Sequence, residues 1–387
     1  MTQTSRKTLK DKTGQRKTSV SRHRGRSCCY VFFIIAIVFS TERFFLWSSN
    51  HVSNGGLDLP SRSSDLLRES YVNLTSDFLR ESGIQPDGIV HSWEAMLEVG
   101  PCDDARGDFN TEPLIHVATA LDPKYLVEVF PSWLTALASS NLSNLIILHI
   151  LTNELSAVQR YIVRLLVKKI MRGSVSFTLA VDITRFNETY TYGSLPHISV
   201  VTQARLLLPG LLPCREKIIW IDMDAFVVGD LYPAWTATQL PDCGIAGREM
   251  NTYFFDSWRA TKHFRWNEVF GKAFNAGVVV LDLSRLRDNH FERLVERFAV
   301  KLGLDDQFTL NMACNGTYTR LEAGMNVFQR EDYGFTPPHD EWIVVHFLGD
   351  RKPWLGSKAE TPESQEIWEV NRVAFGEALI DSNIQKT

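Results

Sequence analysis

Short apolar runs alternate with amphipathic segments from residue 112 onward. The runs resemble buried strands in length and composition, and we expect strands at 114–119, 145–150, 175–181 and 217–222. The amphipathic segments have helical spacing, and we expect helices up to about residue 139, over 154–171 and near 197–212. Strands that alternate with helices form crossover units, so the sequence predicts an α/β fold with a mainly parallel sheet, covered on both faces. In such sheets ligands bind at the carboxyl ends of the strands.

The first 47 residues follow a different pattern. Residues 1–27 carry nine Lys or Arg and one acidic residue, and an apolar stretch follows at 28–47. This order predicts a basic cytosolic tail and an uncleaved signal-anchor helix, which would place the rest of the chain in the lumen. A cleaved signal peptide and a buried core helix are the alternatives, but no small-residue cleavage site follows the stretch. Glu42 and Arg43 interrupt it, and we interpret them as snorkelling at the luminal boundary.

The remaining chain divides by composition. Residues 48–64 are rich in Ser, Gly and Asn, which is typical of a flexible stem, and residues 65–80 have helical spacing. We therefore expect a luminal stem over 48–111, one folded domain over 112–356 and a C-terminal extension over 357–387.

The charge of the chain is unevenly distributed. The net charge is −4, but residues 1–27 alone carry +8, so the other 360 residues carry −12. An acidic body argues against a general nucleic-acid binder, because phosphate contacts require clustered Lys and Arg on the folded domain. A hydrophobic content of 44% excludes wholesale disorder.

Sequons and cysteines agree with a luminal body. Sequons of the form Asn-x-Ser/Thr begin at Asn73, Asn141, Asn187 and Asn315. Cys28 and Cys29 lie at the predicted cytosolic membrane edge, where either packing or palmitoylation explains them. The other cysteines are Cys102, Cys214, Cys243 and Cys314. In an oxidising compartment these four favour two disulfides, and three pairings remain open.

The first candidate for chemistry follows a predicted strand. Asp222 and Asp224 come directly after the apolar run that begins at Lys217. Strand alternation places both carboxylates on one side of the chain, where they repel unless a cation lies between them. A divalent metal that bridges to a diphosphate would relieve this repulsion. The alternative interpretation is an aspartate at the end of a strand that only caps a turn.

The second candidate lies near the C-terminus. A β-branched run at 343–345 leads to His346, followed by Gly349 and Lys352. A neutral imidazole can serve as a metal ligand, glycine can expose backbone N–H groups, and lysine can neutralise phosphate. The two motifs together predict a metal-assisted diphosphate clamp, although a lone histidine is more often structural.

Four motifs occur in one order: Asp222-Met-Asp224, Phe274-Asn-Ala-Gly277, Asp306-Gln307 with Leu310-Asn311, and His346-x-x-Gly349-x-x-Lys352-Pro-Trp. With them the chain resembles the family 8 retaining glycosyltransferases, the glycogenin and galactinol synthase group, over residues 112–356. The resemblance implies a single catalytic domain with a GT-A fold and Rossmann-like nucleotide binding. It also implies a UDP-sugar donor, Mn²⁺ and retention of anomeric configuration.

The resemblance assigns roles to individual residues. It implies that the metal ligands are Asp222, Asp224 and His346, and that Gly349 and Lys352 hold the diphosphate. For the nucleotide it implies Thr119, Asp122, Tyr125 and Arg205, with Tyr125 stacking on the uridine. Pro123 departs from common family members in this segment.

At the reacting centre the resemblance places Asn275, Ala276 and Gly277 against the donor sugar. It places Asp306 and Gln307 near the anomeric carbon, as candidate nucleophile and stabiliser. Retention proceeds either through a covalent intermediate on a carboxylate or by same-face attack within an ion pair, and both routes remain open. The aromatic-rich segment 251–272 is a hypothetical acceptor contact, with core packing as the alternative.

We therefore expect a type II membrane glycosyltransferase of the Golgi or ER. It would transfer a hexose or pentose from a UDP-sugar to a hydroxyl of a glycan or glycoprotein, with Mn²⁺ as cofactor. The alternative is a catalytically weak sugar-nucleotide- or glycan-binding protein on the same scaffold. A metal-dependent phosphohydrolase would need more carboxylates and a nucleophile motif, and we find neither.

Overall fold

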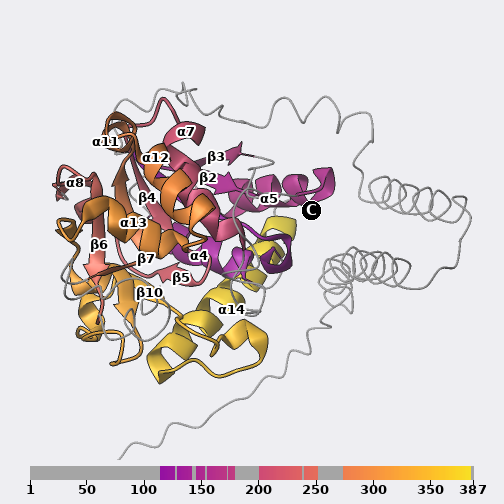
Figure 1. Cartoon of the computed structure of the whole chain (residues 1–387). Helices are drawn as coiled ribbons and strands as arrows, with labels where there is room; N and C mark the ends of the chain where they lie inside the picture. Colours follow the sequence, from indigo (N-terminus) through magenta and orange to yellow (C-terminus); the bar gives the residue numbers. More distant parts are fainter. Residues whose placement is uncertain are drawn as a thin grey trace, which may run out of the picture. The chain divides into compact units, whose positions relative to one another are not determined.

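A computed structural model describes residues 114–126, 129–141, 145–152, 155–171, 173–178, 200–237, 239–251 and 273–384. Its centre is a seven-stranded sheet in the order β3-β2-β1-β4-β7-β6-β8 (Figure 1). The strands of this sheet are β1 (Leu114–Ala120), β2 (Leu145–Leu151), β3 (Gly173–Thr178), β4 (Lys217–Ile221), β6 (Ile245–Glu249), β7 (Phe274–Asp282) and β8 (Thr319–Arg320). A smaller sheet has the order β5-β10-β9, formed by Ala225–Val227, Val344–His346 and Val327–Phe328.

Strand direction confirms the predicted mainly parallel sheet. β1 pairs in parallel with β2 and with β4, and β2 pairs in parallel with β3. β7 is antiparallel to both β4 and β6, and β8 is again parallel to β6. Because β7 runs opposite to β4, the start of β7 lies at the edge where β4 ends. This reversal brings two of the predicted motifs to one place.

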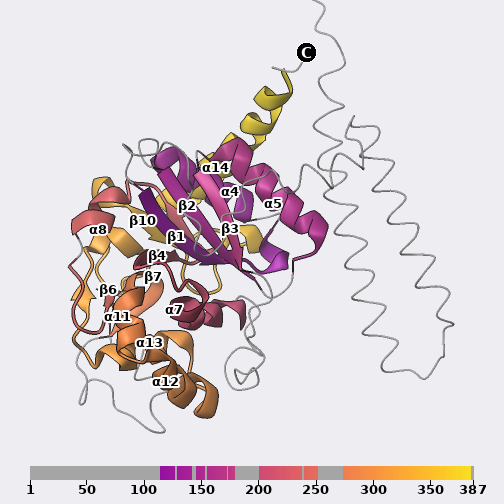
Figure 2. The ribbon, with the colours of Figure 1, turned by 90° about the horizontal axis from the view of Figure 1, so that it is seen from above.

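Helices cover both faces of the sheet (Figure 2). One face carries α4 (Phe130–Ser140), α5 (Ala157–Ile170) and α14 (Pro362–Ile384). The other carries η2 (Val200–Leu207), α7 (Leu208–Leu211), α11 (Leu283–Asp288), α12 (Phe291–Val295) and α13 (Asp306–Cys314). This arrangement confirms the predicted two-sided covering.

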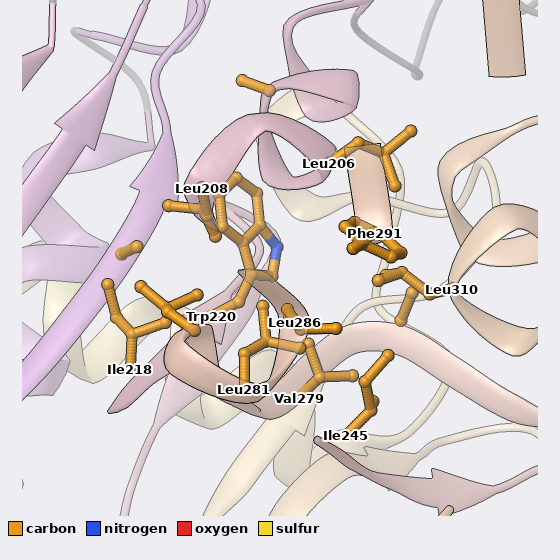
Figure 3. Packing of buried hydrophobic residues seen from close by; sticks show 14 of the residues in the cluster. Leu206, Leu208, Ile218, Trp220, Ile245, Val279, Leu281, Leu286, Phe291 and Leu310 are labelled. Atoms are coloured by element: carbon orange, nitrogen blue, oxygen red, sulfur yellow. The ribbon is translucent and has the colours of Figure 1, made fainter. Parts of the chain in front are cut away.

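Alternation along the strands produces the two core faces. Ile218 and Trp220 of β4 and Val279 and Leu281 of β7 join the cluster under α11–α13 (Figure 3). Their neighbours Ile219, Ile221, Val278 and Val280 are equally buried. A strand that is apolar on both sides is what a doubly covered sheet requires, and for this reason the apolar runs were recognisable in the sequence.

Most predicted elements agree with the structure. The runs at 114–119, 145–150 and 217–222 are β1, β2 and β4, and the segment 154–171 contains α5. α5 begins with a capping box, in which Ser156 and Gln159 each bond the other's backbone N–H. The prediction at 175–181 overlaps β3, and its end lies outside the described residues.

The predicted helix near 197–212 takes another form. From Val200 to Leu207 the chain is a 3-10 helix, and only Leu208–Leu211 is α-helical. Pro209 lies at the start of that last turn, where its missing N–H costs no hydrogen bond. The tighter winding was not visible in the spacing, because both kinds of helix place residues three positions apart on nearly the same side.

The C-terminal segment includes α14, which packs on the domain. Trp368 of α14 is 6% exposed, and its ring lies 5.8 Å from that of Phe226 and 5.3 Å from that of Trp354. Phe226 and Trp354 also stack on each other, at 6.2 Å. The predicted extension therefore supports β5 and the loop after Lys352.

One disulfide narrows the cysteine pairing. Cys243 is bonded to Cys314, which joins the turn before β6 to the end of α13. Cys214 is also disulfide-bonded, and Cys102 lies outside the described residues. Of the three pairings left open by the sequence, this bond selects the one with Cys243 and Cys314 together.

Two of the predicted sequons lie in the described part. Asn315 is exposed and follows α13, whereas Asn141 is 5% exposed at the end of α4. The Asn141 amide donates to the Leu137 carbonyl (3.1 Å) and accepts from the Leu231 N–H (3.0 Å). Both ends of this side chain are used inside the fold, so a glycan on Asn141 is incompatible with the folded domain.

The predicted tail, anchor and stem (1–111), the sequons at Asn73 and Asn187 and most of the segment 251–272 lie outside the described residues. Within the described residues, every helix is too short or too polar to cross a bilayer. The predicted anchor at 28–47 therefore stays a prediction.

Candidate functional site

A cavity of about 360 Å³ opens where β1 and β4 end and β7 begins. Nearly every residue singled out in the sequence lines it: Asp122, Tyr125, Arg205, Asp222, Asp224, Asn275, Ala276, Gly277, Asp306, Gln307, His346, Gly349 and Lys352. They come from segments up to 230 residues apart, so the fold gathers them. Thr119 is the exception: its side chain is fully buried in β1 and does not line the cavity.

Asp222, Asp224 and His346 form the centre of the site. One ligand atom from each lies within 4.8 Å of the others. Asp222 and Asp224 belong to the tight turn after β4, in which the Ala225 N–H donates to the Asp222 carbonyl (2.9 Å). His346 ends β10, which pairs with β5 just beyond this turn, with His346 opposite Ala225. Strand pairing therefore fixes the imidazole beside the carboxylates.

Gly277 makes room for this imidazole. A Cβ on Gly277 would lie 2.0 Å from Cε1 of His346, closer than any side chain tolerates. The Gly277 carbonyl accepts from the Asp222 N–H (2.8 Å), so the same residue also holds the start of the turn. The glycine predicted to face the sugar thus has a second task, which is to let His346 approach the sheet.

The two aspartates experience different electrostatic environments. Asp224 bonds Lys352 Nζ (2.5 Å) and lies 3.2 Å from His346 Nε2. Burial alone would raise its pKa, but Lys352 and His346 hold the pKa of this carboxyl well below its ordinary value. Asp224 is therefore ionised and ready to bind a cation.

For Asp222, burial has the largest effect on the pKa of the carboxyl, which it raises. The negative charge of Asp224 raises this pKa further, and the positive charge of Arg205 lowers it. Arg205 NH2 and Trp220 Nε1 each donate to Asp222 Oδ1 at 2.7 Å. Asp222 also lines the cavity.

Arg205 connects the two acidic parts of the site. Its side chain is 3% exposed; NH2 pairs with Asp222, and Nε lies 2.6 Å from Asp306 Oδ2. NH1 donates to the Ala276 carbonyl, and the guanidinium lies 4.8 Å above the Trp220 ring. These contacts hold protein carboxylates in place, and the predicted role of Arg205 in nucleotide binding stays a prediction.

Asp306 and Gln307 begin α13. Asp305 caps this helix by accepting from the Phe308 N–H (2.6 Å), which leaves Asp306 and Gln307 in the first turn, facing the cavity. Gln307 Oε1 accepts from Asn275 Nδ2 (3.1 Å) and from the Ala276 N–H (2.9 Å). The candidate nucleophile and stabiliser therefore lie beside the residues predicted to face the donor sugar.

The predicted uridine segment lies at the end of β1. Asp122 caps the short 3-10 helix η1 (Pro123–Tyr125), and Pro123 occupies its first position without disturbing it. Burial, with the charges of Asp224 and Asp122, raises the pKa of the Tyr125 hydroxyl. Tyr125 is thus a neutral aromatic at the cavity wall, which suits stacking on a base.

Sequence reasoning missed part of the cavity wall: Val129, Val201, Thr202, Met223, Asp305, Tyr333, Leu348 and Trp354 also line it. Met223 and Trp354 stood inside quoted motifs without a role. Tyr333 carried no sequence signal. Burial raises the pKa of its hydroxyl to about 12, and it packs with Met250, Phe308 and Leu348.

The three central residues suit a divalent cation. Two carboxylates and an imidazole are hard-to-borderline donors of the kind that Mn²⁺ accepts, and two carboxylates this close repel each other unless cations lie between them. Lys352 and Arg205 supply such cations within the protein. The His346 Nδ1 is bonded to the Asn326 side chain (3.0 Å), which leaves Nε2 toward Asp224 as the ligand atom.

Comparisons with known proteins agree with this geometry. The sequence model of the family described as Glycosyl transferase family 8 matches residues 116–358. General stress protein A of Bacillus subtilis is 25% identical over 198 residues, covering 44% of this chain and 65% of that protein. Probable galacturonosyltransferase-like 10 of Arabidopsis thaliana is 26% identical over 210 residues, covering 50% and 54%. The chain thus spans less than two thirds of these relatives.

Solved structures show the same fold. The galactosyltransferase LgtC, in complex with donor and acceptor sugar analogues, superposes with a TM-score of 0.52. It is 18% identical in sequence, and the match covers 67% of this chain and 96% of LgtC. The fold is therefore GT-A, a mixed α/β domain with a central, mostly parallel sheet. Because the family match covers more than half of the chain, the protein belongs to glycosyltransferase family 8.

Proposed function

We propose that the protein is a retaining glycosyltransferase that uses a UDP-sugar and a divalent metal, with Mn²⁺ as the preferred ion. The observation that carries this proposal is the convergence of Asp222, Asp224 and His346 within 4.8 Å, in the cavity that also holds Asp306 and Gln307. A bound cation would neutralise the diphosphate as it leaves.

Lys352 and Gly349 support the diphosphate assignment. Lys352 is 3% exposed. Its ammonium pairs with the Asp224 carboxylate and also donates to the Phe347 carbonyl. A lysine held there contributes positive charge beside the metal ligands and stabilises the growing charge on a leaving phosphate. Gly349 has φ +72°, a conformation that glycine adopts easily, and it lines the cavity.

Asp306 is the proposed nucleophile or ion-pair stabiliser. Arg205 holds one of its oxygens at 2.6 Å, and the residue is 5% exposed at the cavity wall. The ion pair orients this carboxylate, which serves either route to retention. Gln307, oriented by Asn275 and the Ala276 N–H, presents its amide next to it.

The donor sugar is proposed as a hexose or pentose, and the acceptor as a hydroxyl of a glycan or glycoprotein in the secretory pathway. Two of the similar curated proteins are named as probable galacturonosyltransferase-like, so a uronic acid donor belongs in any panel. The basic tail, the apolar stretch and the exposed Asn315 sequon support the luminal placement.

The test is a donor panel with the full chain in detergent. UDP release from each UDP-sugar is measured with Mn²⁺, with and without EDTA. We expect release with at least one donor and its loss in EDTA. UDP binding without release from any donor, hydrolysis included, would contradict the enzyme and favour the sugar-nucleotide-binding alternative.

A further inference from the structure

We propose that Asn326 is a positioning residue that sets the orientation of His346 for the metal and, through Asn275, joins the metal site to the donor-sugar wall. This inference rests on the proposed function. Asn326 itself does not line the cavity and lay in no sequence motif. Its side chain lies between the two parts of the site.

The evidence is a chain of short hydrogen bonds. Asn326 Oδ1 lies 3.0 Å from His346 Nδ1, and Asn326 Nδ2 donates to Asn275 Oδ1 at 2.9 Å. Asn275 Nδ2 in turn donates to Gln307 Oε1 at 3.1 Å. The chain therefore runs without a break from the predicted metal ligand to the predicted stabiliser of the reacting centre.

Backbone donors fix the direction of this chain. The Ala276 N–H can only donate, so the Gln307 atom 2.9 Å from it is the carbonyl oxygen. The Gly277 N–H donates to Asn275 at 2.9 Å, so the atom that it meets is likewise Oδ1. Asn326 must then present its NH₂ to that oxygen, which leaves its own Oδ1 for His346.

The consequence concerns the histidine ring. An amide oxygen accepts only, so His346 Nδ1 carries the hydrogen in this contact. The Nε2 atom, 3.2 Å from Asp224 Oδ1, is the nitrogen left for a metal. Two backbone N–H groups on β7 thus determine, through three amide side chains, which nitrogen of His346 faces the carboxylates.

Asn326 is held firmly enough to do this. It is fully buried and ends the 3-10 helix η5 (Ala323–Asn326), just before β9. Its carbonyl accepts from NH1 of the buried Arg248. Gly324 lies so close to the 341–343 loop that a Cβ there would stand 1.9 Å from the Glu341 carbonyl. The backbone therefore leaves the amide little freedom to turn.

A purely structural role is the competing explanation, because buried amides are normally hydrogen-bonded. The two explanations differ in what a substitution changes. A structural amide affects folding alone, whereas a positioning residue also changes metal affinity at equal folding. Second-sphere partners of metal-bound histidines typically contribute about 10–100-fold in metal affinity.

The main test compares full-length wild type with Asn326→Leu, purified in the same detergent. Mn²⁺ binding is measured by titration with detection of free Mn²⁺ by electron paramagnetic resonance. We expect Asn326→Leu to bind Mn²⁺ about 10–100-fold more weakly. Asn371→Leu is the matched control, since Asn371 is a buried amide on α14 that bonds the Ile367 carbonyl; its Mn²⁺ affinity should equal that of wild type.

Asn326→Asp separates the two halves of the hydrogen-bond chain. A carboxylate still accepts from His346 Nδ1, so Asn326→Asp should bind Mn²⁺ nearly as tightly as wild type. It cannot donate to Asn275 Oδ1, so kcat should stay below that of wild type while Mn²⁺ affinity does not. This split would not arise from a general loss of folding, and it remains measurable if Asn326→Leu folds poorly.

Nitrogen NMR of ¹⁵N-histidine-labelled protein gives a measurement that needs no metal. His346→Gln identifies the His346 signals, and we expect Nδ1 of His346 to be protonated in wild type.

If wild type binds Mn²⁺ and folded Asn326→Leu binds it equally, or if Nδ1 is unprotonated, the inference is overturned and the proposed function stands. If wild type binds no Mn²⁺, the proposed function fails, and the metal-positioning role fails with it.

Discussion

Two clusters of ionisable groups are buried on the same sheet, and their surroundings differ. At the carboxyl end of β4, Arg205 pairs with Asp222 at 2.7 Å and Lys352 with Asp224 at 2.5 Å, and His346 Nε2 lies 3.2 Å from Asp224. Within the strands, His116 of β1 and His149 of β2 stack with ring centroids 5.2 Å apart. Their ring nitrogens Nδ1 and Nε2 are 3.0 Å apart.

The difference lies in compensation. In the first cluster each carboxylate has a cationic side chain beside it, which offsets part of the cost of its burial. In the second, burial lowers the pKa of His149 well below its ordinary value, and His116 and Arg215 lower it further. His149 Nδ1 also lacks a hydrogen-bond partner among the described residues. The first cluster thus pairs its carboxylates with cationic side chains, whereas the histidine pair is stable only while His149 is neutral.

Removing the shared cation should have the largest effect. Arg205→Met leaves Asp222 and Asp306 without their common partner, and breaking a buried ion pair costs about 3–5 kcal/mol. We expect a loss of this size in the free energy of unfolding, measured by urea denaturation at pH 7.5. Arg287→Met, which removes only hydrogen bonds to backbone carbonyls, is the comparison. Equal losses would show that the site carboxylates do not depend on Arg205.

Neutralising one carboxylate should remove activity with a smaller effect on folding. Under the proposed function Asp224 holds the metal that neutralises the leaving diphosphate, so in Asp224→Asn we expect UDP release to fall at least about a hundredfold. Asp230→Asn, an exposed carboxylate six residues further along, should leave the rate unchanged. Full activity in Asp224→Asn would contradict the assignment of this residue to the metal.

Crowding the histidine should weaken metal binding. In Gly277→Ala the new methyl would lie 2.0 Å from the His346 ring, so the imidazole must move away from Asp224. We expect Mn²⁺ affinity to fall about 10–100-fold, as for the loss of a positioned ligand. Gly210→Ala is the control, since a Cβ there meets nothing within 4 Å. Unchanged affinity would mean that His346 is not a ligand.

Replacing His149 of the histidine pair should have the smallest effect, and this effect depends on pH. A folded-state pKa below the unfolded value means that stability is present above about pH 6.5 and is lost as pH falls below it. Below this pH, His149 alone should lower the free energy of unfolding by about 1.4 kcal/mol per pH unit. His149→Leu should flatten the profile of unfolding free energy between pH 7 and 5, and the exposed His339→Gln should not. A profile unchanged by His149→Leu would show that the pair tolerates protonation.

The sequence allowed prediction of the elements that local pattern determines. β1, β2 and β4 are buried on both sides, so their apolar runs stood out. The residues of the Asp222, Asn275, Asp306 and His346 motifs were also identified, and the cavity brings them together. Their roles in binding and catalysis remain predictions.

What the sequence concealed depends on contacts between distant segments. The reversed direction of β7, which brings Asn275 to Asp222, follows from pairing and not from composition. Arg205 reaches Asp306, and Asn326 reaches Asn275, across gaps of 101 and 51 residues. A buried asparagine before a short strand resembles a turn residue when read alone. Only the fold reveals that its amide faces a histidine.

The antiparallel pairing of β6 and β7 continues past the ends of both strands. The Met250 N–H donates to the Ala273 carbonyl (2.9 Å), and the Asn251 N–H donates to the Tyr333 carbonyl (2.7 Å). Asn251 and Ala273, the described residues on either side of 252–272, are therefore both tied to the domain by backbone hydrogen bonds. The start of β7, and with it Asn275 at the cavity wall, is thus held by backbone contacts of its own.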